Sequence, residues 1–111
     1  MIEQIIYDYL NANASVPWYM MRPKQADKAY GLFEKTGSSI TDHIYTSTFA
    51  FQSYGNSLYE AAQISAELVN IMKDIIILPE VSKSKLTAEY NFTNTADKQH
   101  RYQAVFELVH Y

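Results

Sequence analysis

From Arg101 to Tyr111 the chain reads Arg-Tyr-Gln-Ala-Val-Phe-Glu-Leu-Val-His-Tyr, which predicts a β-strand with apolar side chains on both faces. Successive side chains of a strand point to opposite sides. One face therefore carries Tyr102, Ala104, Phe106 and Leu108, and the other carries Val105, Val109 and Tyr111. A strand wetted on one face would instead alternate apolar with polar residues. Either this strand is sandwiched within the chain, or its second face meets another copy of the protein.

Length and composition predict a single domain, residues 1–111, that is rich in tyrosine. The chain has 10 Tyr, 5 Phe and 1 Trp. A chain of this length buries about 60–70 % of its surface on folding. Tyr combines an apolar ring with a polar hydroxyl group, so it suits half-buried positions and contact surfaces. Ordinary β-rich domains are also rich in Tyr, so both interpretations stay open.

Several classes of protein are disfavoured by the sequence. The net charge is −3 and charges of both signs are scattered, whereas nucleic-acid binders usually concentrate basic residues on one face. The chain has no Cys, which excludes disulfides, thiol catalysis and thiolate metal sites. No apolar run approaches the ~20 residues that cross a bilayer, and the first residues lack the basic leader of a signal peptide. We expect a soluble, intracellular protein without membrane or sequence-specific nucleic-acid partners.

The pattern of apolar residues predicts an α+β fold. Thr36-Gly37-Ser38-Ser39 is expected to be a turn, Pro23 to close an extended segment, and a polar loop from Asn94 to His100 to join the last two strands. The expected elements are a short helix at 2–12, an extended segment at 18–21, strands at 29–34 and 40–54, a long helix from 57 to about 76, and strands at 86–93 and 101–110. Their order is α-β-β-β-α-β-β. We expect a mostly antiparallel sheet with the long helix packed across it.

The long helix has the clearest signals. Ser57 followed by Glu60 forms a capping box, in which each side chain accepts from a backbone N–H group at the start of the helix. An apolar stripe at helical spacing follows, and it predicts a face that lies on the sheet. The stripe comprises Leu58, Ala61, Ala62, Ser65, Leu68, Val69, Met72 and Ile76, and it is widened by Ile64, Ile71 and Ile75.

No catalytic, metal or cofactor site is visible in the sequence. His43, His100 and His110 are far apart and lack ligand spacing, and we interpret His43 and His110 as strand residues. Glu89 and Glu107 fit outward strand positions, and isolated glycines form no phosphate-binding loop. We therefore predict that the protein is not an enzyme, although a carboxylate or His site assembled across the chain stays a third possibility.

The order of elements resembles that of the small tail-completion proteins of long-tailed bacteriophages (siphoviruses). These are tail terminators and tail-to-head joining proteins, some known as minor capsid proteins. The resemblance rests on the helix leading into Val16-Pro17-Trp18-Tyr19, on Phe51-Gln52-Ser53-Tyr54-Gly55-Asn56-Ser57 followed by Tyr59-Glu60-Ala61-Ala62, and on the closing strand with Arg101-Tyr102-Gln103 and Val105-Phe106-Glu107-Leu108. It covers nearly the whole chain.

The resemblance implies a virion protein of the tail or neck that is assembled in the host cytoplasm. Six copies would form a ring on the tail tube, stop its growth and offer a docking face to the head connector. The implied partners are other copies of the chain, the tail tube protein and the head–tail connector protein, with no cofactor. Terminator and joining protein are not separated by these motifs.

Candidate contact residues follow from both lines of reasoning. Large apolar groups in an irregular segment often mark a contact surface, although Trp18 and Met20 could instead fold back as a lid on the sheet edge. Two lysines are expected in a polar connector before the strand at 86–93. The candidates for contact with neighbouring subunits or the tube are Trp18, Tyr19, Met20, Met21, Lys83, Lys85, Tyr102, Val105, Val109 and Tyr111. The alternative function is a small ligand-binding or regulatory domain with a pocket between the long helix and the sheet.

Overall fold

The computed structural model describes residues 1–21, 29–93 and 100–111. Pro23, predicted to close an extended segment, lies outside these ranges. So does the predicted loop from Asn94 to His100, except for His100 itself. The elements are α1 (Ile2–Asn13), β1 (Trp18–Tyr19), β2 (Tyr30–Thr41), β3 (Ile44–Gly55), α2 (Leu58–Lys73), the 3-10 helix η1 (Asp74–Ile77), β4 (Val81–Asn91) and β5 (His100–His110). The predicted α+β class and the order α-β-β-β-α-β-β are confirmed.

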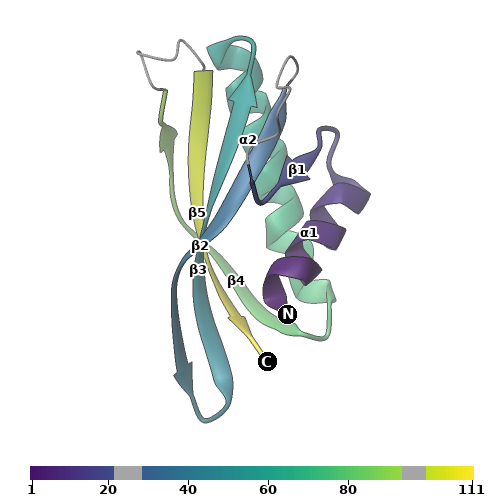
Figure 1. The fold of residues 1–111 in the computed structure, drawn as a ribbon, viewed down its shortest axis with the longest axis vertical. Helices are drawn as coiled ribbons and strands as arrows, with labels where there is room; N and C mark the ends of the chain where they lie inside the picture. The colour runs from purple at the N-terminus through teal and green to yellow at the C-terminus, as the bar shows by residue number, and fades with distance from the viewer. Residues whose placement is uncertain (22–28, 94–99) are drawn as a thin grey trace.

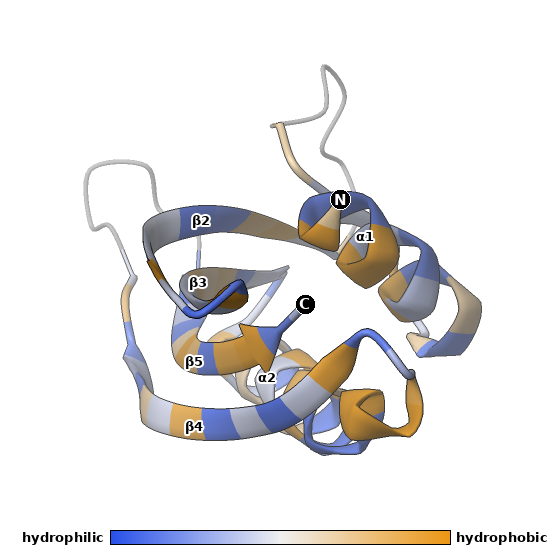
Figure 2. Cartoon of the chain, turned by 90° about the horizontal axis from the view of Figure 1, so that it is seen from below, coloured by the Kyte–Doolittle hydropathy of each residue, from blue (hydrophilic) through white to orange (hydrophobic). Residues whose placement is uncertain are grey.

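One sheet of five strands organises the described chain, in the order β1-β2-β3-β5-β4. The short strand β1 runs parallel to β2, and the other neighbours are antiparallel. The sheet curves around the two helices, which lie on the same side of it (Figures 1 and 2). We call the side that faces the helices the inner face and the other side the outer face. Strand β5 lies between β3 and β4, so the apolar strand at the end of the chain is an interior strand of the sheet.

Aromatic side chains of β2, β3 and β5 meet both helices in one core. Phe49, Phe51 and Phe106 are 0 % exposed, and Phe33 is 2 % exposed. They pack with Leu68 and Met72 of α2 and with the buried stripe of α1, formed by Ile2, Ile6 and Leu10. The sheet supplies the rings of this core and the helices supply mostly aliphatic side chains, which together fill the space between them.

The stripe of α2 is confirmed in its middle and wrong at its ends. Ala61, Ile64, Ser65, Leu68, Val69 and Met72 are buried. Leu58 is 39 % exposed because it lies in the first turn, and Ile76 is 54 % exposed because η1 replaces the α-helix there. Ser57 Oγ accepts from Glu60 N at 3.1 Å, which confirms the predicted cap, and the Glu60 carboxylate accepts from Asn56 N at 2.7 Å.

The turn of the first hairpin lies at Asp42 and His43, and not at 36–39 as predicted from the sequence. Strand β2 continues through the predicted turn to Thr41, and Asp42 and His43 make the turn with φ angles of 51° and 67°. His43 is therefore a turn residue and not a strand residue. At Thr36 the chain makes a β-bulge instead of a turn, and the Thr36 hydroxyl group donates to the Thr48 carbonyl oxygen at 3.3 Å.

Candidate functional site

The Trp18–Met21 segment divides into a buried half and an exposed half. Trp18 is 1 % exposed, which corrects its assignment as a surface contact. Its ring packs edge-on against Phe51, and the amide of Asn11 bonds to both its backbone N–H and its carbonyl group. The indole thus folds back onto the sheet, as the lid alternative predicts for Trp18 but not for Met20. Met20 and Met21 remain on the surface, 46 % and 80 % exposed.

The exposed methionines adjoin the outer face of the sheet. With β2 and β3 they line a shallow hollow of about 110 Å³ whose walls include Leu32, Glu34 and Gln52. This hollow is open, small and only partly apolar. It offers a surface on which a partner could rest, and it is too small to enclose a ligand, since ligand pockets usually have about 300–1,000 Å³.

The two lysines lie in a strand and not in a connector, because β4 begins at Val81. Lys83 and Lys85 are exposed, on the same face as their partners Val109 and Glu107 of β5. The strand carries register shifts at Ser82 and Thr87. The hydroxyl groups of these two residues donate to the carbonyl oxygens of Val109 and Val105, at 3.2 and 3.0 Å. Each bulge thus satisfies a carbonyl group of the neighbouring strand.

The residues of β5 are divided between two faces as the sequence predicts, and the two faces differ in burial. Ala104, Phe106 and Leu108 are buried on the inner face, and Tyr102 on the same face is half-buried. Val105 and Val109 are half-buried on the outer face, where no described helix or strand forms a second layer (Figure 2). Tyr111, just beyond the strand, is 69 % exposed.

The hairpin of β2 and β3 is a surface that sequence reasoning missed. Every residue from Glu34 to Tyr45 is exposed, and Ile40, Ile44 and Tyr45 present large apolar groups with exposed fractions of 55, 41 and 40 %. In Figure 1 the turn of this hairpin reaches the lower end of the molecule. The signal was present in the sequence as isoleucines flanking Asp42-His43, but a turn assigned at 36–39 placed them inside a strand.

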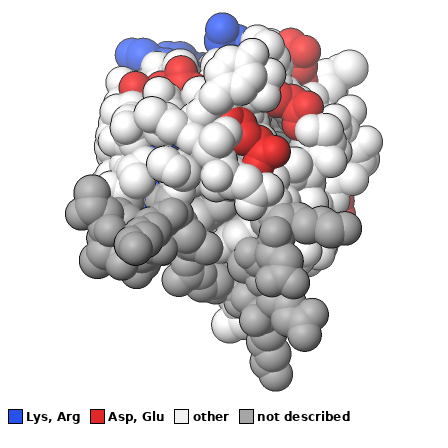
Figure 3. Space-filling view, turned by 90° about the horizontal axis from the view of Figure 1, so that it is seen from above, with Lys and Arg blue, Asp and Glu red and all other residues white. Residues whose placement is uncertain are grey.

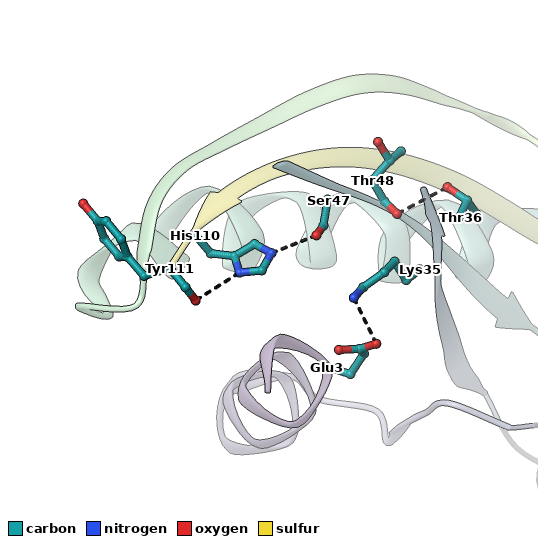
Figure 4. Close-up of polar contacts among 7 residues, drawn as sticks. All are labelled: Glu3, Lys35, Thr36, Ser47, Thr48, His110 and Tyr111. Atoms are coloured by element: carbon teal, nitrogen blue, oxygen red, sulfur yellow. Dashed lines mark hydrogen bonds and ion pairs between the residues drawn. The ribbon is translucent and has the colours of Figure 1, made fainter. Parts of the chain in front are cut away.

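A buried polar cluster lies where β3, β5 and α1 meet (Figure 4). Ser47 Oγ lies 2.8 Å from His110 Nε2, and His110 Nδ1 lies 3.5 Å from the Tyr111 carbonyl oxygen. The Tyr45 ring stacks on the His110 ring with centroids 5.4 Å apart. Close by, Lys35 Nζ pairs with Glu3 Oε2 at 3.3 Å and so joins α1 to β2.

The electrostatics of this cluster favour a neutral imidazole. Burial lowers the pKa of His110, and the nearby Lys35 ammonium group and N-terminal amine lower it further, although the Tyr111 carbonyl group and Glu3 act in the opposite direction. In the tautomer that carries the proton on Nδ1, this nitrogen donates to the Tyr111 carbonyl oxygen and Ser47 donates to Nε2. This arrangement provides a hydroxyl group and a base. However, Ser47 is 0 % exposed and His110 is 5 % exposed, so a substrate does not reach them in this structure.

The remaining ionisable groups form no further centre within the described ranges. No set of three or more His, Asp or Glu side chains there could hold a metal ion. Glu89 is exposed, but it lies on the inner face, where it accepts from the Ser65 hydroxyl group of α2, so the expectation that it points away from the helices is wrong. Glu67 accepts from both the backbone N–H and the hydroxyl group of Ser15, at 2.9 and 3.0 Å. These carboxylates tie elements together.

Three further features bear on function: the charges at one end of the molecule, the hydropathy of the helices and the packing beside α2. Figure 3 shows the end of the molecule opposite the hairpin turn, where Lys and Arg lie at one margin, several Asp and Glu side chains lie beside them, and the rest of the described surface is uncharged. In the described parts of the chain, neither helix has the length and hydropathy of a membrane span. The space between the middle of α2 and the sheet is filled by Phe49, Phe106, Leu68 and Met72. A hollow of about 330 Å³ lies beside the first half of α2, where Glu60, Ile64 and Glu67 face Ser15, Val16 and Ala29.

Comparison of the sequence with known proteins gives no assignment. No family model matches the chain, and no curated protein matches it.

Proposed function

We propose that the protein is a structural subunit of a tailed bacteriophage, which forms a ring that ends the tail tube and joins it to the head connector. The choice of this class rests on the resemblance of the chain to tail-completion proteins. The observation that carries the proposal is the outer face of the sheet, where Val105 and Val109 of an interior strand have no covering layer among the described residues. A neighbouring subunit or the tube would cover this face.

The distribution of exposed apolar residues supports an assembly role further. The core is closed, yet Met20, Met21, Ile40, Ile44 and Tyr111 are all more than two-fifths exposed. Such residues are common singly, but grouped apolar exposure beside a complete core usually marks a contact surface. A subunit that contacts two neighbours, a tube and a connector needs several such surfaces, and this chain offers them on the hairpin, beside β1 and beside β5.

The test is electron microscopy of phage tails made with and without this protein. Without it, we expect tubes of uncontrolled length or tails that fail to join heads. Uncontrolled length would favour a terminator, and normal length without attachment would favour a joining protein. Normal tails attached to heads in its absence would refute both versions. A supply of the wild-type protein in trans should restore particles, which controls for effects on neighbouring genes.

A further inference from the structure

Two groups of exposed apolar side chains lie at opposite margins of the sheet. The first, which we call the hairpin patch, lies near the turn between β2 and β3 and consists of Ile40 and Tyr45 on the inner face and Ile44 on the outer face. The second, which we call the β4 patch, consists of Ile76, Ile77 and Tyr111, and adjoins the start of β4. Tyr111 belongs to it because its backbone N–H group donates to the carbonyl oxygen of Glu80 at 3.1 Å.

The two patches lie at the two ends of a single row of paired residues. Ile40 pairs with Tyr45, Tyr45 with His110, and His110 with Val81 of β4. The hairpin turn, the C-terminus and the connection from α2 to β4 all lie toward the same end of the long axis in Figure 1. The hairpin turn reaches farther toward this end than the C-terminus and the connection do, so two copies placed side by side bring one patch against the other when they are offset along that axis.

The charges of the two margins are complementary. From Thr36 to Thr48 the only carboxylate is Asp42, and this segment contains no Lys or Arg. From Val81 to Ala88 the only charged residues are Lys83 and Lys85, both exposed, although Glu80 precedes them and Glu107 of β5 lies opposite Lys85. Attraction between Asp42 and the two lysines favours an encounter of the hairpin with the β4 margin and disfavours contact between two hairpins or between two β4 margins.

The edge strand β4 indicates that a contact between two copies is made by side chains and not by pairing of strands. Strand β4 is at the margin of the described sheet, and its two bulges and two lysines are features that block pairing of an edge strand with another strand. Continuous extension of the sheet through β4 is therefore disfavoured. The exposed isoleucines and tyrosines on both margins do not need strand pairing to make contact.

We infer that the occupant of the β4 patch is the hairpin patch of a second copy of this chain, with Asp42 facing Lys83 and Lys85. Different surfaces meet in such a contact, so it is head-to-tail and closes into a ring when the rotation between copies allows. The ring itself rests on the proposed function, but the pairing of these two patches can be tested with the isolated protein.

Engineered cysteines test the pairing directly, because the chain contains no Cys. A variant with both Ile40→Cys and Ile77→Cys, concentrated and oxidised, should give a ladder of disulfide-linked multimers on a non-reducing gel. A variant with only one of the two replacements should stay monomeric, because two identical patches do not meet in a head-to-tail contact. The matched control combines Ile40→Cys with Tyr59→Cys, since Tyr59 is 73 % exposed but lies in the first turn of α2. Only monomers from the first variant, or an equal ladder from the control, would overturn the inference.

An exchange of charges tests the role of Asp42. In the variant with both Ile40→Cys and Ile77→Cys, the further change Asp42→Lys should lower the yield of multimers several-fold. The pair of changes Lys83→Glu and Lys85→Glu should lower it in the same way. The chain that carries all three charge changes should recover the yield. Failure of the triple variant to recover, while circular dichroism shows that it is folded, would contradict the facing of these charges.

The outcomes separate this inference from the proposed function. A ladder from the isolated protein, together with normal tails in its absence, would retain the contact and refute the phage role. Conversely, tails that depend on the protein, but in which the same cysteine pair fails to cross-link inside particles, would retain the phage role and refute the contact.

Discussion

The indole ring of Trp18 occupies the space that a side chain on Gly31 would need. A Cβ atom at Gly31 would lie 2.3 Å from two ring atoms of Trp18, and the two residues are partners in the parallel pairing of β1 with β2. Because Gly31 of β2 has no side chain, the ring of Trp18 from β1 fits at this position. This packing explains why the Trp18 ring is buried while Met20 and Met21 are exposed.

Replacement of Gly31 by Ala should destabilise the protein by about 1–3 kcal/mol, because the ring of Trp18 must leave its packed position. Chemical denaturation monitored by the fluorescence of the single Trp would report both the loss of stability and the change around the ring. Gly37→Ala is the matched control, since nothing lies within 4 Å of a Cβ atom there. Equal effects of the two replacements would show that Trp18 is not held by Gly31.

Leu68→Ala in α2 should lower the free energy of unfolding by about 2–5 kcal/mol through lost burial and a residual cavity. Leu68 is 1 % exposed, whereas Leu58 in the same helix is 39 % exposed, so Leu58→Ala serves as the control with a much smaller effect. Urea denaturation gives both values. A loss below half of the lower estimate at Leu68 would show that this face of α2 is not packed as described.

Ser57→Ala should cost about 1 kcal/mol, within the usual range of about 0.5–2 kcal/mol for loss of an N-cap. The Ser57 hydroxyl group accepts from Glu60 N, and without it this N–H group loses its partner at the start of α2. Ser38→Ala, an exposed position in the hairpin, should change stability little. Thermal unfolding followed by circular dichroism would compare them, and equal melting temperatures would argue against the cap.

Three errors of sequence reasoning, those on the first hairpin turn, the start of β4 and Glu89, have their physical cause in the bulges. An extra residue in a strand reverses the alternation of faces that follows it. The bulge at Thr87 turns Glu89 toward α2. Without the bulge, the alternation of faces counted from Leu86 would place Glu89 on the outer face. Because the bulge at Ser82 interrupts the alternation, the sequence pattern did not show that β4 begins at Val81. The Gly-Ser segment after Thr36 resembled a turn. Whether such residues form a turn or continue a strand depends on pairing with β3, which is a non-local contact.

Features set by local chemistry or by long periodicity were predicted correctly. The capping box at Ser57, the buried middle of α2 and the two faces of β5 each depend on a pattern that a single element imposes. The cluster of Ser47 with His110 joins residues 63 positions apart, so no spacing in the sequence could reveal it. The hairpin patch likewise depends on where the turn falls.

The stability of the protein should fall as the pH is lowered through the range in which His110 takes up a proton. Burial lowers the pKa of His110 in the folded state, while in the unfolded state its pKa is about 6.5. Below that value the unfolded state binds more protons than the folded state. The contribution of the neutral imidazole is therefore complete above about pH 6.5 and is lost as the pH falls toward the folded-state pKa.

The groups around His110 determine what a variant should show. Tyr45 stacks on the ring, Ser47 bonds to it, and Lys35 and Glu3 act on it through their charges. Urea denaturation between about pH 7.5 and 5 should give a steeper loss of stability for the wild type than for His110→Gln. Gln can still bond to Ser47 but does not titrate. His43→Gln, in the exposed turn, should keep the wild-type slope. If His110→Gln and the wild type lose stability in parallel, protonation of His110 does not oppose folding.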